Sequence, residues 1–298
     1  MSVVGRLAPS PTGSLHLGNV RTFLWAWLSA RSQGGRVLLR IEDLDTPRVK
    51  PGTVEKMIDD LHWLGLDWDG EVEIQSRRRD YYREIFKRLE GTIYPCRCTR
   101  TEIAALACAP HEGDQEIRYP GTCRGYSGAA AAWRLRVEPG VVRFDDRLFG
   151  PQAIDVSATV GDFAVAKSPE QPAYQLAVVA DDLAQGVTEV VRGDDLIPST
   201  ARQILLYRAL GENPPAHGHV PLVVGPDGRR LAKRHGDARI ATLRERGVSP
   251  ERIIGILAAW SGLGEGDATP ACLVSRWSWN RAMKERIVLT PERLREVV

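Results

Sequence analysis

The sequence has 298 residues, enough for one large or two modest domains whose core needs no disulfide or metal to hold it together. The formal net charge is only +2, and no run approaches the roughly 18 apolar residues of a membrane span, which excludes a strongly basic coat and a transmembrane helix. The N-terminus lacks the apolar core of a secretory signal. The odd number of cysteines, five, argues against a disulfide framework, so we expect a cytoplasmic protein.

The charge is unevenly distributed along the chain. Residues 1–215 hold 26 basic and 29 acidic side chains, whereas residues 216–298 hold 14 basic and 9 acidic ones. A basic segment of this kind can contact the phosphates of a nucleic acid, although such a segment is more often a solvated surface. Both interpretations stay open at this point.

The first 41 residues show the pattern of a strand, a helix and a second strand. Residues 3–8 form a short apolar run that ends in a turn-rich segment, PSPTGS. From residue 19 apolar side chains recur at helical spacing up to a glycine pair, and residues 36–41 form a second apolar run. This βαβ pattern predicts a parallel sheet and an α/β fold.

Later elements are less regular. We predict a helix capped by Thr53, a helix over 78–89, a helix capped by Ser199 or Thr200, and mostly helices after residue 215. Residues 94–132 lack periodicity and hold four of the five cysteines, which predicts an insertion. Strands are predicted over 133–137, 142–144, 174–179 and 188–192.

Residues 9–19, PSPTGSLHLGN, lie where the first strand meets the first helix. A helix N-terminus offers unpaired N–H groups and a partial positive charge, which suit phosphate, and Gly13 and Gly18 permit close backbone approach. His16 can donate a hydrogen bond to phosphate or simply cap the helix, and the residues alone leave both possibilities open. The spacing matches neither the P-loop nor the dinucleotide-binding glycine motif.

This segment resembles the HIGH signature of class I aminoacyl-tRNA synthetases, in the form found in the glutamyl and glutaminyl branch. Further motifs of that branch resemble RIEDLDT at 40–46, YQLAVVADD at 174–182 and VRGDDL at 191–196. The resemblance implies a Rossmann-like catalytic domain with a parallel sheet and a helical C-terminal part.

The domain boundaries follow from the same resemblance. It implies a catalytic domain over 1–215, with a zinc-bearing, acceptor-type insertion at about 94–132. Residues 216–298 then hold a KMSKS-like loop and a helical stem-contact region, without an anticodon-binding domain.

The resemblance also implies a site for glutamate. In this branch the residue at Glu42 meets the amino group of the amino acid, and the arginine at Arg6 pairs with its side-chain carboxylate through two parallel hydrogen bonds. Without the resemblance, Glu42 fits a solvated loop, and Tyr174 and Arg192 fit structural positions. The glutamate-binding residues implied are Arg6, Leu7, Ala8, Pro9, Ser10, Glu42, Tyr174 and Arg192.

A second implied site holds ATP with Mg²⁺. Residues 230–234, RLAKR, occupy the five positions of the KMSKS loop, and Lys233 falls on the second lysine, which meets ATP. Arg230, Ala232 and Arg234 depart from the motif, so the residues alone indicate only a basic turn. Catalysis is implied for His16 and Lys233, and ATP binding for His16, Gly18, Asn19, Arg230 and Lys233.

Three cysteines have the spacing of a metal site. Cys96, Cys98 and Cys123 supply three thiolates, and zinc takes four ligands in a tetrahedron. Tyr119, Cys108 and His111 are available as a fourth ligand, and chemistry alone favours Cys108 or His111 over a tyrosine; free buried cysteines are the alternative to a metal site. The resemblance implies a structural zinc ion held by Cys96, Cys98, Tyr119 and Cys123, because a subset of the family places C-x-C and Y-x3-C in this insertion.

The resemblance implies a specific reaction as well. Only 83 residues follow Pro215, too few for a separate anticodon reader. A truncated, zinc-containing member of the family activates L-glutamate with ATP and transfers it to the queuosine base of tRNA(Asp), and we expect this reaction here, from a monomer. The alternatives are a truncated synthetase that charges a tRNA 3′ end and a non-catalytic tRNA-binding paralogue.

Overall fold

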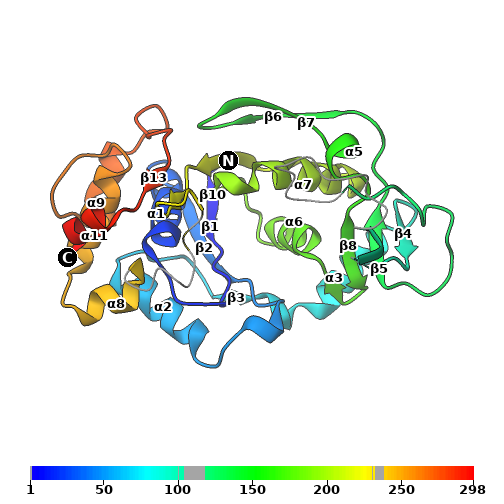
Figure 1. Cartoon of the computed structure of the whole chain (residues 1–298), viewed down its shortest axis with the longest axis horizontal. Coiled ribbons are helices and arrows are strands. Elements are labelled where there is room, and N and C mark those ends of the chain that lie inside the picture. The colour runs from blue at the N-terminus through cyan, green and yellow to red at the C-terminus, as the bar shows by residue number, and fades with distance from the viewer. Residues whose placement is uncertain (1, 100, 104–117, 230, 232–237) are drawn as a thin grey trace.

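The computed structural model describes residues 2–99, 101–103, 118–229, 231 and 238–298. Its centre is a set of parallel strands, β1, β2 and β10, with helices packed around them (Figure 1). The strands of this central layer are β1 (Val4–Leu7), β2 (Arg36–Ile41), β3 (Glu73–Ile74), β10 (Glu189–Gly193) and β11 (Ala216–Val220).

Parallel pairing joins β3, β2 and β1 on one side and β10 and β11 on the other. The two halves meet where the Thr188 N–H donates to the Val4 carbonyl at 2.9 Å. The predicted α/β fold with a parallel sheet is therefore confirmed. The structure places β11 in this sheet, although it lies beyond the predicted domain boundary at residue 215.

The first helix, α1 (Leu17–Arg31), connects β1 to β2 as predicted. It carries an almost continuous buried surface and packs against β1 and β10, because its apolar side chains recur on the faces turned to the sheet and to the C-terminal helices. Its neighbours along the chain are α2 (Thr53–Trp63) and α3 (Arg79–Arg88), joined through the short 3₁₀ turns η1 (Thr46–Arg48) and η2 (Gln75–Arg77).

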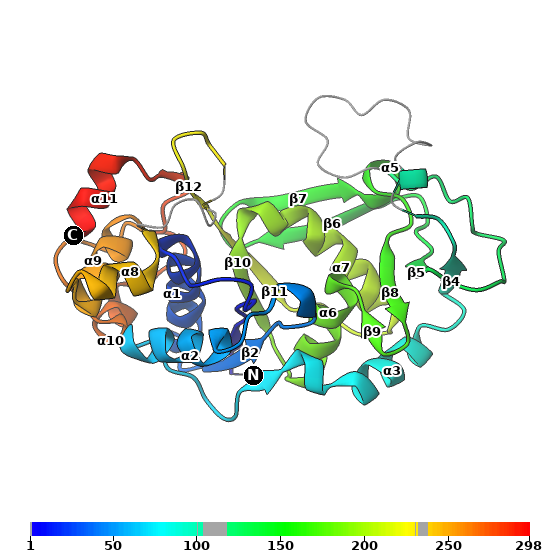
Figure 2. The same ribbon diagram turned by 60° about the horizontal axis from the view of Figure 1, so that its bottom comes forward.

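A second module is built from antiparallel strands. The strands β4 (Ile93–Cys96), β5 (Ala132–Leu135), β8 (Ala164–Ser168) and β9 (Gln171–Pro172) form one antiparallel sheet, so the predicted insertion starts inside one strand and ends inside another. The hairpin of β6 (Val141–Asp146) and β7 (Gly150–Asp155) runs from the central strands toward α5 (Val156–Thr159) and this sheet (Figure 2).

The module has a hydrophobic core of its own, formed with α3, α6 (Tyr174–Ala184) and α7 (Ile197–Ala209). The turn η3 (Asp194–Leu196) connects β10 to α7.

The C-terminal part is mostly helical, as predicted, and shares one core with α1. The Trp25 indole N–H donates to the Ser261 hydroxyl at 2.7 Å, which ties the two parts together. The elements here are β12 (Val223–Val224), α8 (Ile240–Glu245), α9 (Pro250–Ala259), α10 (Pro270–Leu273), η5 (Val274–Arg276), β13 (Ile287–Val288) and α11 (Pro291–Val297).

Three local predictions are wrong. Residues 174–179 lie in a helix, α6, rather than a strand, because α6 is buried on nearly all sides and its apolar run has no helical periodicity to read. Thr53 does not cap α2, since Gly52 occupies the N-cap with φ 74° and no side chain caps the helix. Ser199 and Thr200 lie inside α7, which begins at Ile197.

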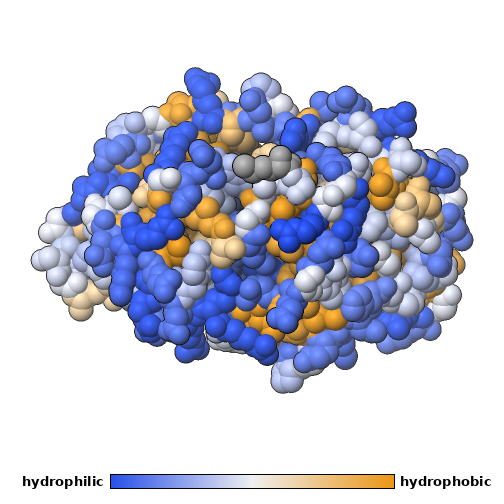
Figure 3. Space-filling view, turned by 180° about the vertical axis from the view of Figure 1, so that it is seen from behind, coloured by the Kyte–Doolittle hydropathy of each residue, from blue (hydrophilic) through white to orange (hydrophobic). Residues whose placement is uncertain are grey.

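The face of the molecule opposite to that of Figure 1 is mainly hydrophilic (Figure 3). On this face, apolar side chains show in patches separated by polar ones (Figure 3). Among the described residues, no helix has the length and apolar character that crossing a bilayer requires.

Candidate active site and metal centre

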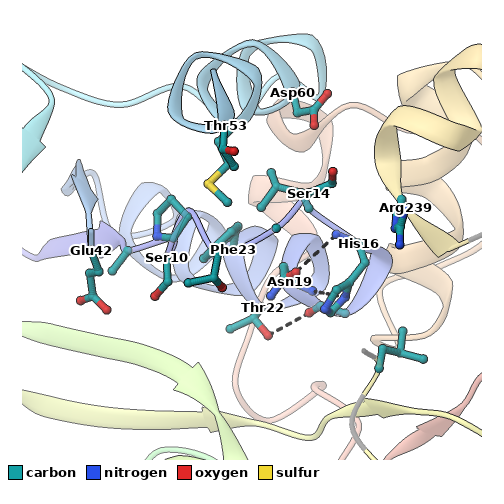
Figure 4. A pocket seen from close by; sticks show the side chains of 18 of the residues that line it. Ser10, Ser14, His16, Asn19, Thr22, Phe23, Glu42, Thr53, Asp60 and Arg239 are labelled. Carbon is teal, nitrogen blue, oxygen red and sulfur yellow. Dashed lines mark hydrogen bonds between the residues drawn. The ribbon is translucent and has the colours of Figure 1, made fainter. Parts of the chain in front are cut away.

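A cavity of about 1120 Å³ opens at the carboxyl ends of the parallel strands. Its walls come from the segments that follow β1, β2, β10 and β11, which is where ligands bind in open α/β sheets. Figure 4 shows Glu42 at one end of the cavity, Asp60 and Arg239 toward the other, and His16 and Asn19 between them at the start of α1.

His16 caps the first helix and lines the cavity at the same time. Its Nδ1 accepts the Asn19 N–H at 3.3 Å, and the Asn19 side-chain oxygen accepts the His16 N–H at 3.3 Å. A Cβ atom at Gly18 would lie 3.1 Å from the His16 ring, so the glycine allows the ring to fold back over the helix. The helix N-terminus that results presents the positive end of the helix dipole to the cavity, which favours an anion there.

The charged side chains that the sequence analysis assigned to amino-acid binding lie at the Glu42 end of the cavity (Figure 4). The cavity wall contains Arg6, Glu42, Tyr174 and Arg192, which come from β1, the end of β2, α6 and β10. Ala8, Pro9 and Ser10 line it too. Leu7 is the exception, because its side chain is fully buried in the hydrophobic core.

Arg6 does not use all of its N–H groups in hydrogen bonds to the described residues. It is 5% exposed, and one Nη1 N–H donates to the Val191 carbonyl at 3.1 Å. Its Nε lies 3.5 Å from a carboxylate oxygen of Asp182 but makes no hydrogen bond among the described residues. A buried guanidinium with an unpaired N–H is costly unless a ligand satisfies it.

Arg192 is held only by uncharged partners. Its Nε donates to His219, Nη1 to Gln203 at 2.7 Å, and Nη2 to Thr200 at 2.7 Å. Burial lowers the pKa of Arg192. Because no carboxylate contacts its guanidinium within the described structure, its charge suits an anionic ligand in the cavity.

Glu42 forms an ion pair with a fully buried arginine, Arg40. Arg40 donates to Glu42 at 3.2 Å and to Asp182 at 2.7 Å. Burial raises the pKa of Glu42, while the positive charges of Arg40 and Arg6 act to lower it. This carboxylate therefore faces the cavity with a fixed direction, as recognition of an ammonium group requires.

Sequence reasoning missed the residues behind these side chains. Asp181 and Asp182 sit on the buried face of α6, where Asp181 accepts hydrogen bonds from Gln75 at 2.7 Å and Tyr82 at 2.9 Å. Arg78 also pairs with Asp181 at 2.8 Å. The two aspartates belong to the VADD part of the motif at 174–182. Because the sequence predicted a strand over 174–179 and the structure has a helix there, their positions could not be predicted.

The far end of the cavity carries mixed charge. Asp60 on α2 is 7% exposed, and burial raises its pKa to about 6, opposed by the charge of Arg244. Lys50 and Lys56 also line the cavity. The predicted Arg230 and Lys233 lie outside the described residues.

The cysteine cluster has the dimensions of a zinc site. The Sγ atoms of Cys96, Cys98 and Cys123 all lie within 4.8 Å of one another, with Cys98 and Cys123 at 3.5 Å. The Tyr119 hydroxyl lies 3.4 Å from the Cys96 sulfur and 4.0 Å from the Cys98 sulfur. A tetrahedral zinc ion with Zn–S near 2.3 Å has sulfur–sulfur separations of about 3.8 Å, so the spacing of the three sulfur atoms is consistent with one ion, and the Tyr119 hydroxyl lies beside them.

A buried cation accompanies the cluster. Arg134 is 8% exposed, donates to the Cys96 sulfur at 3.2 Å, and has its guanidinium carbon 3.8 Å from the centre of the Tyr119 ring. Three thiolates around a divalent ion would leave net negative charge, which Arg134 would offset. The alternative ligands Cys108 and His111 lie outside the described residues.

Comparisons with known proteins show the family of the chain. Residues 2–267 match the family described as tRNA synthetases class I (E and Q), catalytic domain. A glutamyl-Q tRNA(Asp) synthetase from Rhodopirellula baltica is 50% identical over 282 residues, covering 88% of this chain and 86% of the relative. One from Nitratidesulfovibrio vulgaris is also 50% identical, over 279 residues, covering 87% and 86%.

A solved structure gives the same result for the fold. The crystal structure of a glutamate tRNA ligase from Elizabethkingia meningosepticum, in complex with its amino acid, superposes with a TM-score of 0.84 at 28% identity, covering 100% of this chain and 69% of that one. The chain belongs to the catalytic-domain family of class I tRNA synthetases for glutamate and glutamine, among its glutamyl-Q tRNA(Asp) synthetase members.

Proposed function

We propose that this chain activates L-glutamate with ATP and transfers the glutamyl group to the queuosine base of tRNA(Asp). Its similarity to glutamyl-Q tRNA(Asp) synthetases over most of both chains supports the reaction. The structural observation that supports this reaction most is that two buried arginines, Arg6 and Arg192, line the same cavity as His16.

In this proposal the amino acid is recognised by charge at both ends. Arg6 and Arg192 bind the side-chain carboxylate, which selects glutamate over glutamine, and Glu42 binds the ammonium group. Tyr174, 43% exposed, covers the site from α6. The backbone of residues 7–10 completes the site and accounts for Leu7, whose side chain faces the core.

ATP binds along the start of α1. The amides of the first turn, with His16, Gly18 and Asn19, hold its phosphates. Arg230 and Lys233 contribute positive charge to ATP binding, and Mg²⁺ would accompany ATP and offset phosphate charge. The α-carboxylate of glutamate attacks the α-phosphorus, the bond to the β-phosphate oxygen breaks, and pyrophosphate leaves behind glutamyl-adenylate.

The second step is acyl transfer. A hydroxyl group of queuosine attacks the activated carbonyl, AMP leaves with the former bridging oxygen, and the hydroxyl proton is released. We further propose that the chain acts as a monomer in the cytoplasm.

The proposed domains divide the contacts with tRNA. Residues 1–215 carry activation, and Cys96, Cys98, Tyr119 and Cys123 of the insertion at about 94–132 would hold zinc. When bound, zinc supplies a rigid cross-link, with all four positions filled by protein. Residues 216–298 supply the KMSKS-like loop and basic surface for the tRNA stem.

Glutamate-dependent ATP–pyrophosphate exchange tests the first step. We expect the purified chain with Mg²⁺ to exchange label into ATP without any tRNA, and to do so with glutamate but not glutamine. Absence of exchange would refute activation and favour a tRNA-binding protein without catalysis.

A further inference from the structure

Behind Arg192 lies a chain of buried side chains that the proposed chemistry does not use. The Asp146 carboxylate, at the end of β6, lies 2.6 Å from Nδ1 of His219 on β11. Nε2 of His219 lies 3.3 Å from Nε of Arg192. His219 is fully buried and Asp146 is 4% exposed, so water does not complete either set of hydrogen bonds.

These partners assign the proton on His219. Arg192 Nε carries a hydrogen at every accessible pH, so Nε2 of His219 must accept it with a lone pair. The ring proton then resides on Nδ1, where it is donated to Asp146. The ring is therefore neutral, with Nδ1 as the donor and Nε2 as the acceptor, and the Thr200 hydroxyl, 3.2 Å from Nε2, can donate a second hydrogen bond to it.

Asp146 is itself held in one orientation. Its Oδ1 accepts the backbone N–H groups of Leu148 at 3.0 Å and Phe149 at 2.9 Å, which leaves Oδ2 for His219. Burial alone would raise the pKa of Asp146, but the hydrogen bonds from His219 and Phe149 lower it. The carboxylate is thus a fixed acceptor aimed at Nδ1.

We propose that Asp146 and His219 are positioning residues for the acidic side chain of the substrate. Asp146 fixes the tautomer of His219, and His219 fixes the direction of the Arg192 guanidinium at the cavity wall. The inference rests on the proposed function, in which Arg192 binds the carboxylate of glutamate. Neither residue lines the cavity, so both act through Arg192 and not on the reacting atoms.

An Asp146→Asn substitution separates tautomer control from packing, because the two side chains have the same shape. The two backbone N–H donors hold the amide oxygen at the Oδ1 position, so the NH₂ group faces Nδ1 of His219. Nδ1 must then accept, the ring proton moves to Nε2, and two N–H groups face each other between His219 and Arg192. We expect the KM for glutamate to rise about ten- to a hundred-fold, as for one lost hydrogen bond to a charged group.

Substitutions of His219 supply matched controls. In His219→Gln the amide oxygen can stand where Nε2 stands and needs no help from Asp146. In His219→Asn the shorter amide reaches only toward Asp146. We expect the KM for glutamate to rise less than about threefold in the glutamine variant and at least tenfold in the asparagine variant.

The test combines exchange kinetics with ¹⁵N NMR of histidine-labelled protein. We expect Asp146→Asn to raise the KM for glutamate while leaving the KM for ATP within about twofold, to add no further loss in the His219→Gln background, and to move the His219 proton from Nδ1 to Nε2. A folded Asp146→Asn protein that keeps the proton on Nδ1 of His219 would overturn the proposal. So would a double variant whose KM for glutamate rises by the product of the two single-variant increases.

The two proposals fail in different ways. If Asp146→Asn does not fold, as judged by its melting temperature, the His219→Gln and His219→Asn variants test the positioning role instead. Equal KM values for glutamate in these two variants would overturn it. If the parent chain shows no exchange, the proposed function fails. The tautomer of His219 in the parent and in Asp146→Asn still tests whether Asp146 positions His219.

Discussion

Replacing Arg6 by glutamine isolates the charge that selects glutamate. The guanidinium lines the cavity, is 5% exposed, and leaves its Nε without a hydrogen-bond partner among the described residues. Asp182, 3.5 Å away, keeps its shorter contact of 2.7 Å with Arg40 after the substitution. The change therefore removes ligand donors without leaving a buried carboxylate unpaired.

The expected magnitude follows from two charge-assisted hydrogen bonds. Each contributes about 1.5–3 kcal/mol, and about 1.4 kcal/mol corresponds to a tenfold change. Since a glutamine amide still donates one neutral hydrogen bond, we expect kcat/KM for glutamate to fall about 10²- to 10³-fold. Arg6→Lys keeps the charge but not the fork, so its loss should be smaller, about tenfold.

ATP–pyrophosphate exchange over a range of glutamate concentrations measures the effect. Arg83→Gln is a matched control, because it removes the same charge from an exposed pair with Asp80 and Glu170 away from the cavity. We expect Arg6→Gln to lose discrimination against glutamine and Arg83→Gln to behave as the parent. An Arg6→Gln enzyme with kcat/KM within threefold of the parent would refute the assigned role.

Three further outcomes are expected. Gly18→Ala should raise the KM for ATP about fivefold, since its Cβ meets the His16 ring at 3.1 Å and disturbs a cap worth about 1 kcal/mol; an unchanged KM in exchange assays would contradict this. Cys96→Ser should lose bound zinc and melt at a lower temperature, whereas Cys272→Ser, an exposed control, should keep both; equal zinc by metal analysis would exclude the site. Burial lowers the pKa of His217 well below its ordinary value, so below about pH 6.5 the unfolded chain binds a proton that the folded chain does not. The free energy of unfolding should therefore fall with decreasing pH by up to about 1.4 kcal/mol per unit from this residue, and denaturant titrations of His217→Gln should show a shallower fall than the parent.

The elements that depend on local pattern were predictable from the sequence. The β1–α1–β2 unit matches its prediction closely, because its strands are short apolar runs and its helix begins at a recognisable cap. The cysteine spacing likewise led to the observed cluster of Cys96, Cys98 and Cys123.

Features that depend on tertiary packing were not predictable in the same way. Residues 175–182 are all buried, so their apolar run fits a strand and a helix equally well, and the wrong prediction concealed Asp182 behind the proposed glutamate site. The Asp146–His219 pair joins residues 73 positions apart, and only the pairing of β6 with β11 brings them together.

The central claim is tested most directly by the nucleotide that receives glutamate. With labelled glutamate and ATP, we expect the chain to label tRNA(Asp) that contains queuosine, but neither queuosine-free tRNA(Asp) nor tRNA(Glu), and the label should survive removal of the 3′-terminal nucleoside. Glutamate placed on the 3′ end of tRNA(Glu) would contradict the account.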